Sequence, residues 1–83
     1  MAVRKIDRVR QVPPTPGSDA SIAYAVHFDS GPEPAVVVDY VTSAFASASH
    51  ARQVVTPYLN TEVMPRRFVV DREGNVRVRD TDE

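Results

Sequence analysis

Three arginines near the C-terminal end of the chain are the first residues that could do chemistry. Arg67, Arg77 and Arg79 lie on either side of one glycine-containing turn signal. The planar guanidinium group binds phosphates and carboxylates through paired hydrogen bonds. With His27 from a neighbouring segment, these arginines could contact the phosphates of a nucleic acid. RNA-binding sheets also expose aromatic rings for base stacking, whereas we expect Tyr24 and the phenylalanines in the core. Nucleic-acid binding is therefore the alternative function rather than the leading one.

Other reactive residue types are present without the spacing that catalysis or metal binding needs. Ser47, Ser49 and His50 are close in sequence, but neighbouring positions of a helix point apart. His27 and Asp29 could supply two metal ligands, whereas a metal site needs three or four. The chain has no cysteine, and its three glycines are isolated, which excludes thiol chemistry and a glycine-rich phosphate loop. We therefore expect no enzymatic activity, no metal and no cofactor.

Length and charge restrict the class of protein. The chain has 83 residues and a formal net charge of −1, which allows one domain and gives no overall attraction to nucleic acid or to an acidic membrane. No apolar run approaches the roughly 18 residues of a membrane span, and the first residues lack a signal-peptide core. The expectation is a soluble cytoplasmic protein with no membrane partner.

The elements that must position these residues are mainly strands. Valine occurs 15 times and leucine once, and β-branched valine favours pleated sheet. Residues 21–29 alternate apolar and polar side chains, and residues 35–41 contain the run Val36-Val37-Val38, so the two segments should form an antiparallel hairpin. A competing interpretation begins a helix at Pro34. Thr42 or Ser43 can cap a helix that starts near Ala44.

The predicted helix should kink or stop near Val55, because Pro57 cannot continue the hydrogen-bond ladder. We divide the chain into an edge strand or arm (1–12), a proline-rich linker (13–20), a single α+β domain (21–79) and a frayed acidic tail (80–83). The fold class is α+β, a two-layer sandwich in which a small antiparallel sheet of about four to five strands packs on one helix, in the order β-β-β-α-β-β. The predicted core comprises Ile22, Tyr24, Val26, Phe28, Val36, Val38, Tyr40, Phe45, Ala48, Val55, Leu59, Phe68, Val70, Val76 and Val78.

The sequence distinguishes between two possible registers of the last hairpin. A two-residue loop, Glu73-Gly74, would place Val70 opposite Arg77 and mix apolar and charged side chains on one face. A three-residue loop, 72–74, with Gly74 in the left-handed region, makes one face wholly apolar and puts the arginines on the other. The second register avoids burying arginines and is the one that we predict.

One stretch resembles a known family. Val63-Met64-Pro65, followed by residues 68–76, resembles the cis-proline and the following hairpin of thioredoxin-like proteins. Those proteins carry a redox cysteine upstream, which this chain lacks, so the resemblance implies no redox activity. It raises the question whether the Met64–Pro65 bond is cis.

The valine run provides the main functional clue. Val36 and Val38 cannot share a face with Val37, and a strand that is apolar on both faces is usually covered on both. One helix can cover only one face of the sheet. The other face must then be covered by the N-terminal segment 1–12, by a second copy of the chain or by another protein. The candidate interface therefore comprises Val37, Val41, Arg67, Val69, Arg77 and Arg79. The leading hypothesis is a small non-enzymatic protein-interaction module or accessory subunit, self-associating as a homodimer or docking a protein through this face.

Overall fold

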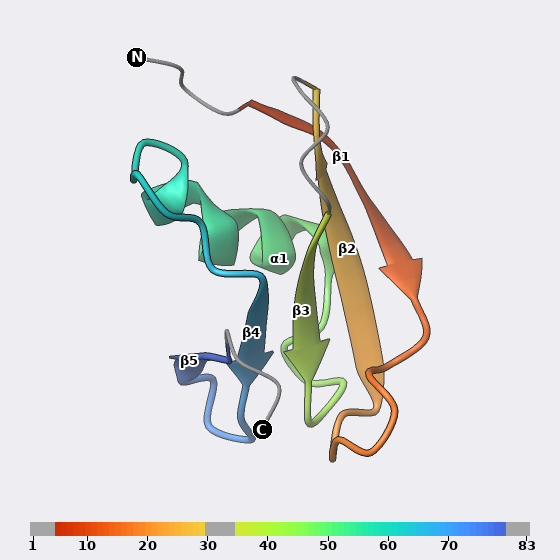
Figure 1. The fold of residues 1–83 in the computed structure, drawn as a ribbon. Helices are drawn as coiled ribbons and strands as arrows, with labels where there is room; N and C mark the ends of the chain where they lie inside the picture. Colours follow the sequence, from red (N-terminus) through yellow and green to blue (C-terminus); the bar gives the residue numbers. More distant parts are fainter. Residues whose placement is uncertain (1–4, 30–34, 80–83) are drawn as a thin grey trace.

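The computed structural model describes residues 5–29 and 35–79, so the predicted tail 80–83, residues 30–34 and the first four residues of the predicted arm 1–12 lie outside the described residues. Five strands, one α-helix and one short 3-10 helix follow one another along the chain (Figure 1). Their bounds are β1 (Ile6–Val12), β2 (Ile22–Phe28), β3 (Val36–Tyr40), α1 (Ala48–Val55), η1 (Thr56–Tyr58), β4 (Arg67–Val70) and β5 (Val76–Val78). The predicted order β-β-β-α-β-β and the α+β class are confirmed. The competing helix from Pro34 is wrong where the chain is described, because Val36–Tyr40 form a strand.

The sheet is mixed, and the prediction of a purely antiparallel sheet is wrong. The strands lie in the order β1-β2-β3-β4-β5. Neighbours pair antiparallel except β3 and β4, which run parallel and point the same way in Figure 1. The chain leaves β3, passes through α1 in the second layer, and re-enters the sheet at the end where β3 began. A crossover of this kind produces a parallel pair, whereas a hairpin produces an antiparallel one.

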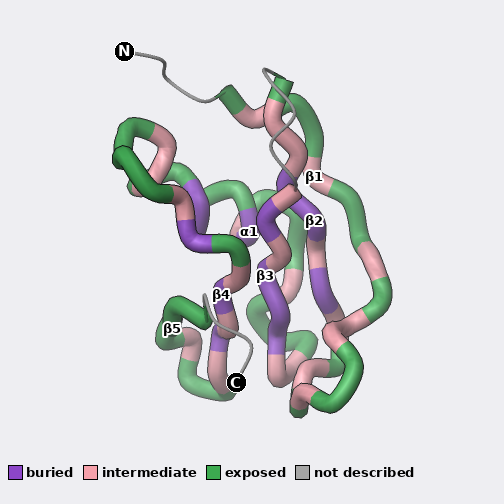
Figure 2. Tube along the Cα trace, viewed as in Figure 1, coloured by how far each residue is buried: buried purple, intermediate pink, exposed green. Residues whose placement is uncertain are grey.

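The core lies between the sheet and the two helices, and Figure 2 shows it as the buried stretches of the central strands. Seven predicted core residues are buried there: Val26, Val36, Val38, Tyr40, Val55, Phe68 and Val70. Ala51 and Val54 of α1 complete it. The Tyr58 ring of η1 lies against the Phe68 ring, with 5.1 Å between centroids.

Four predicted core residues are exposed instead. Phe45 and Ala48 precede or begin the helix, since α1 starts four residues later than Ala44. Val76 and Val78 of β5 lie on the helix side of the sheet, but α1 packs chiefly against β1, β2 and β3, and both valines stay exposed. The helix therefore covers the β1–β3 side of its face better than the β5 side.

Local capping explains where α1 begins and ends. The Ser47 hydroxyl accepts a hydrogen bond from the His50 N–H at 3.0 Å, so Ser47 is the N-cap in place of Thr42 or Ser43. The helix ends at Val55 and continues into η1, which contains Pro57. The prediction of a stop near Val55 followed by a further short turn is confirmed.

The predicted register of the last hairpin is also confirmed. Val70 pairs with Val76 and Phe68 with Val78 across a three-residue loop, and Gly74 has a φ of 88°. The described residues contain no cis peptide bond, so Met64–Pro65 is trans.

Candidate functional site

The sheet face opposite α1, here called the outer face, brings the candidate interface residues together. Alternation along β3 puts Val37 and Asp39 on this face, and the parallel register places them beside Arg67 and Val69 of β4. Val69 in turn lies opposite Arg77 of β5. The Arg79 N–H donates to the Arg67 carbonyl at 2.8 Å and continues the same ladder.

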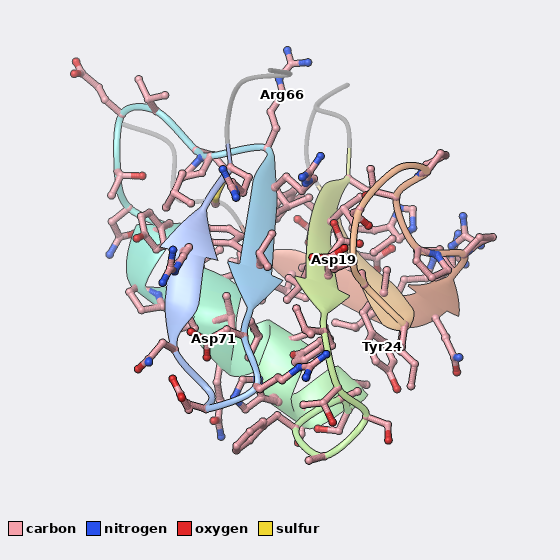
Figure 3. The ribbon with its side chains drawn as sticks, turned by 90° about the horizontal axis from the view of Figure 1, so that it is seen from below. Asp19, Tyr24, Arg66 and Asp71 are labelled. Carbon is pink, nitrogen blue, oxygen red and sulfur yellow. The ribbon has the colours of Figure 1, made fainter. Side chains whose placement is uncertain are left out.

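A groove of about 630 Å³ runs along this face. The segment 15–20, between β1 and β2, forms one side, the end of β3 with Asp39 and Val41 contributes the middle, and β4 with the β5 hairpin forms the other side. Figure 3 shows the molecule turned by 90° from the view of Figure 1. It labels Asp19, in the segment 15–20, and Asp71, just after β4. The groove is lined by Thr15, Pro16, Gly17, Ser18, Asp19, Ala20, Asp39, Val41, Arg67, Val69, Asp71, Arg77 and Arg79. Five of the six candidate interface residues are therefore in one groove, and Val37 lies on the same face outside it.

Asp39 is a fully buried carboxylate in the middle of the outer face. Its Oδ2 accepts a hydrogen bond from the Thr15 hydroxyl at 2.8 Å, and its Oδ1 accepts from the Thr15 N–H at 3.3 Å. The proline-rich segment 13–20 is thereby attached to the centre of the sheet. By contrast, residues 6–12 lie in the sheet beside β2, so it is the segment after them that covers Asp39.

Alternation with Val37 and Val41 puts Asp39 on the outer face, but its burial and its role were not predicted from the sequence. The available signal was its position: aspartate is depleted in strands, and this one follows three consecutive valines. A carboxylate at such a position needs partners, because burying an unpaired charge is costly. The sequence of the strand alone could not show that this partner is Thr15, in the proline-rich segment 13–20.

Arg67 supplies the opposite charge. Its Nε lies 3.3 Å from Asp39 Oδ2, an ion pair whose geometry falls short of a hydrogen bond. The arginine side chain keeps 27% of its surface exposed, whereas the aspartate keeps none. Arg67 is thus held over Asp39 and is less available to a phosphate than its position on the face suggests.

Asp71, at the hairpin, lies close enough to Arg77 to be affected by its charge. Hydrogen bonds from the Asn75 N–H and, to a smaller degree, the Glu73 N–H lower the pKa of the Asp71 carboxyl, and the nearby charge of Arg77 lowers it further. Three arginines and three aspartates line the groove. Its formal charge is therefore balanced.

The histidines lie elsewhere. Arg10 Nε donates to His27 Nε2 at 3.0 Å, and His27 is not among the residues that line the groove. His50 lies on the helix side, with its Nδ1 2.8 Å from the hydroxyl of the buried Tyr40. Burial raises the pKa of Tyr40, so this hydroxyl stays protonated at neutral pH.

Within residues 5–29 and 35–79, no three His, Cys, Asp or Glu side chains are grouped so that they could hold a metal ion. Among the same residues, no helix is long and apolar enough to cross a membrane. The chain shows no significant match to the protein-family models, curated protein sequences or solved structures with which it was compared.

Proposed function

We propose that this chain is a small non-enzymatic interaction module or accessory subunit that binds a protein through its outer sheet face, with a second copy of itself as the first candidate. The observation that carries the proposal is the groove, in which partly exposed Val41 and Val69 lie between paired charges of both signs. A cytoplasmic location remains a prediction that accompanies this proposal.

The balance of charge favours a protein over a phosphate backbone. A nucleic-acid site gains affinity by placing several unneutralised cations against phosphates. Here Asp39 is paired with Arg67, and Asp71 lies near Arg77. A mixed surface of this kind can be self-complementary, because a two-fold axis brings the same patch of two copies together. None of the residues that line the groove is aromatic, so base stacking has no support there.

Light scattering over a series of concentrations tests self-association. We expect the mass of the wild-type chain to rise from monomer to dimer, and Val69→Glu to remain a monomer because it places a charge in the apolar part of the groove. Gln53→Glu on the exposed side of α1 is the matched control and should dimerise like wild type. If Val69→Glu does not fold, Arg77→Glu serves in its place. A wild-type chain that remains monomeric at every concentration would refute self-association.

Nucleic-acid binding is the second candidate, supported by the exposed side chains of Arg77 and Arg79. It predicts that a double substitution of these arginines by glutamine weakens binding of a single-stranded oligonucleotide and reduces its salt dependence. Unchanged salt-dependent binding by the double variant would exclude these residues as the site.

A further inference from the structure

The unpaired edge of β5 is a second candidate binding surface, in addition to the groove. β5 is the last strand in the sheet, so only one of its edges is paired within the described chain. The Asp71 N–H donates to the Asn75 carbonyl at 3.0 Å, and the Arg79 N–H donates to the Arg67 carbonyl at 2.8 Å. Because an antiparallel ladder alternates, residues 75, 77 and 79 bond toward β4. The backbone N–H and C=O groups of Val76 and Val78 therefore point away from the sheet.

The side chains of the same two residues form an apolar border on the helix side. Val76 is 43% exposed and Val78 is 45% exposed, since α1 does not extend over them. Phe45, itself 36% exposed, lies against the hairpin loop: its ring is 3.1 Å from where a side chain on Gly74 would begin. Apolar surface thus continues from the loop along the edge strand.

The opposite side of β5 is basic. Arg77 and Arg79 point to the outer face and are exposed. A strand added beside β5 would meet valines on one side of the sheet and arginines on the other. In sequence, such a strand would alternate apolar and acidic residues, since cross-strand pairs of opposite charge are favourable.

A second β5 does not meet this requirement in the two antiparallel registers that keep the pairing within residues 76–79. Antiparallel pairing of two copies that places Val76 opposite Val78 also places Arg77 opposite Arg77. Moving the register by two residues toward the C-terminus places Arg77 opposite Arg79. Like charges directly opposite one another are destabilising, and charged side chains are a common way to protect an edge strand from self-pairing.

We propose that β5 binds an extended segment of a partner protein, of alternating apolar and acidic residues, by addition of a β-strand. Main-chain hydrogen bonds to Val76 and Val78 would supply affinity, and the arginines would select acidic side chains. The main-chain edge at Val76 and Val78 includes neither Val41 nor Val69, so the inference does not depend on self-association, although Arg77 and Arg79 line both surfaces.

The test is an NMR titration of the ¹⁵N-labelled chain with a synthetic seven-residue peptide that alternates valine and glutamate. We expect shift changes centred on β5 and amide hydrogen exchange at Val76 and Val78 slowed by about tenfold or more, because these N–H groups would become hydrogen-bonded. A peptide alternating valine and lysine should bind at least roughly ten times more weakly, since it opposes the arginines. A valine–glutamate peptide methylated on the amide nitrogens that face β5 should not bind.

Two variants separate this surface from the groove. Val76→Thr with Val78→Thr should weaken peptide binding, whereas Val63→Thr, at an exposed valine outside β5, should leave it unchanged. Val41→Glu, which changes the groove at a residue that is not opposite Arg77 or Arg79, should retain binding at Val76 and Val78 even if it abolishes a dimer. Equal binding of the two charged peptides, or no change at Val76 and Val78 at millimolar peptide, would overturn the proposal.

Discussion

The two faces of β3 and β4 are both buried in their middle, but by different means. On the helix side, Val38, Tyr40, Phe68 and Val70 have no exposed surface and contact one another and the helices. On the outer face the central buried residue is Asp39, held by two hydrogen bonds from Thr15 and by Arg67. One face is stabilised by apolar contact area and the other by directional polar contacts. The polar contacts on the outer face can therefore be replaced by contacts with a binding partner more readily than the apolar contacts of the core can.

The largest expected effect compares two neighbours on opposite faces of β4. Phe68→Ala should lower the free energy of unfolding by about 3–5 kcal/mol, because it leaves a cavity in the core. Val69→Ala should cost less than about 1.5 kcal/mol, since that side chain is already partly exposed in the groove. Urea denaturation measures both values, and a similar cost for the two would contradict the distinction between the faces.

Removing the buried carboxylate should have the next largest effect. Asp39→Ala leaves the Thr15 N–H and hydroxyl without their acceptor and Arg67 without its ion-pair partner, at a cost of roughly 2–3 kcal/mol. Thr15→Val removes only the hydroxyl and should cost about 1.5 kcal/mol while leaving the ion pair. Thermal unfolding gives the two values, and faster amide exchange in residues 15–20 should accompany Asp39→Ala. Unchanged exchange there would show that Asp39 does not hold this segment.

Two glycines with positive φ allow the cost of backbone strain to be separated from the cost of side-chain crowding. Gly74→Val should destabilise by about 1–2 kcal/mol through its φ of 88°, plus a further cost where the new side chain meets Phe45. Gly17→Val carries the same kind of strain at a φ of 80°, but nothing lies within 4 Å of its added Cβ. Chemical denaturation should therefore show the larger loss for Gly74→Val, and equal losses would mean that Phe45 moves aside freely.

The smallest expected effect concerns pH. Hydrogen bonds from Asn75 and Glu73 lower the Asp71 pKa, so the ionised carboxylate stabilises the hairpin. This contribution is present above the ordinary aspartate pKa of about 4 and is lost as pH falls through the lower folded-state value. The Asn75 amide resonance should follow that titration in NMR spectra. Asp71→Asn should abolish the titration while the Val70–Val76 pairing persists.

Local patterns in the sequence predicted the parts of the fold that depend on neighbouring residues. The hairpin register was predictable because Gly74 and the alternation of Phe68 and Val70 act within a few residues of one another. The end of the helix was predictable because proline acts on its own turn. Several residues before α1 can cap a helix, and the local pattern could not show that Ser47 is the one that does.

Features that depend on distant segments were not predicted. The parallel pairing of β3 and β4 follows from the path of the chain through α1, and the long segment between Tyr40 and Arg67 was its only sequence signal. The exposure of Val76 and Val78 depends on how far the helix extends over the sheet. At the site, alternation placed Val69 and the arginines on one face, but the groove required the segment 15–20 to return to Asp39.

The parallel pairing of β3 with β4 also constrains the order in which the chain can fold. β1, β2 and β3 form successive antiparallel pairs, and β4 and β5 form a hairpin, so each group can assemble from residues close in sequence. Among the described strands, the β3–β4 ladder is the pairing that joins the two groups, and it requires the long segment between them to be closed first. Because the entropy of that closure is lost before its contacts form, this ladder should be completed late. The groove spans the same junction and would exist only once both groups have joined.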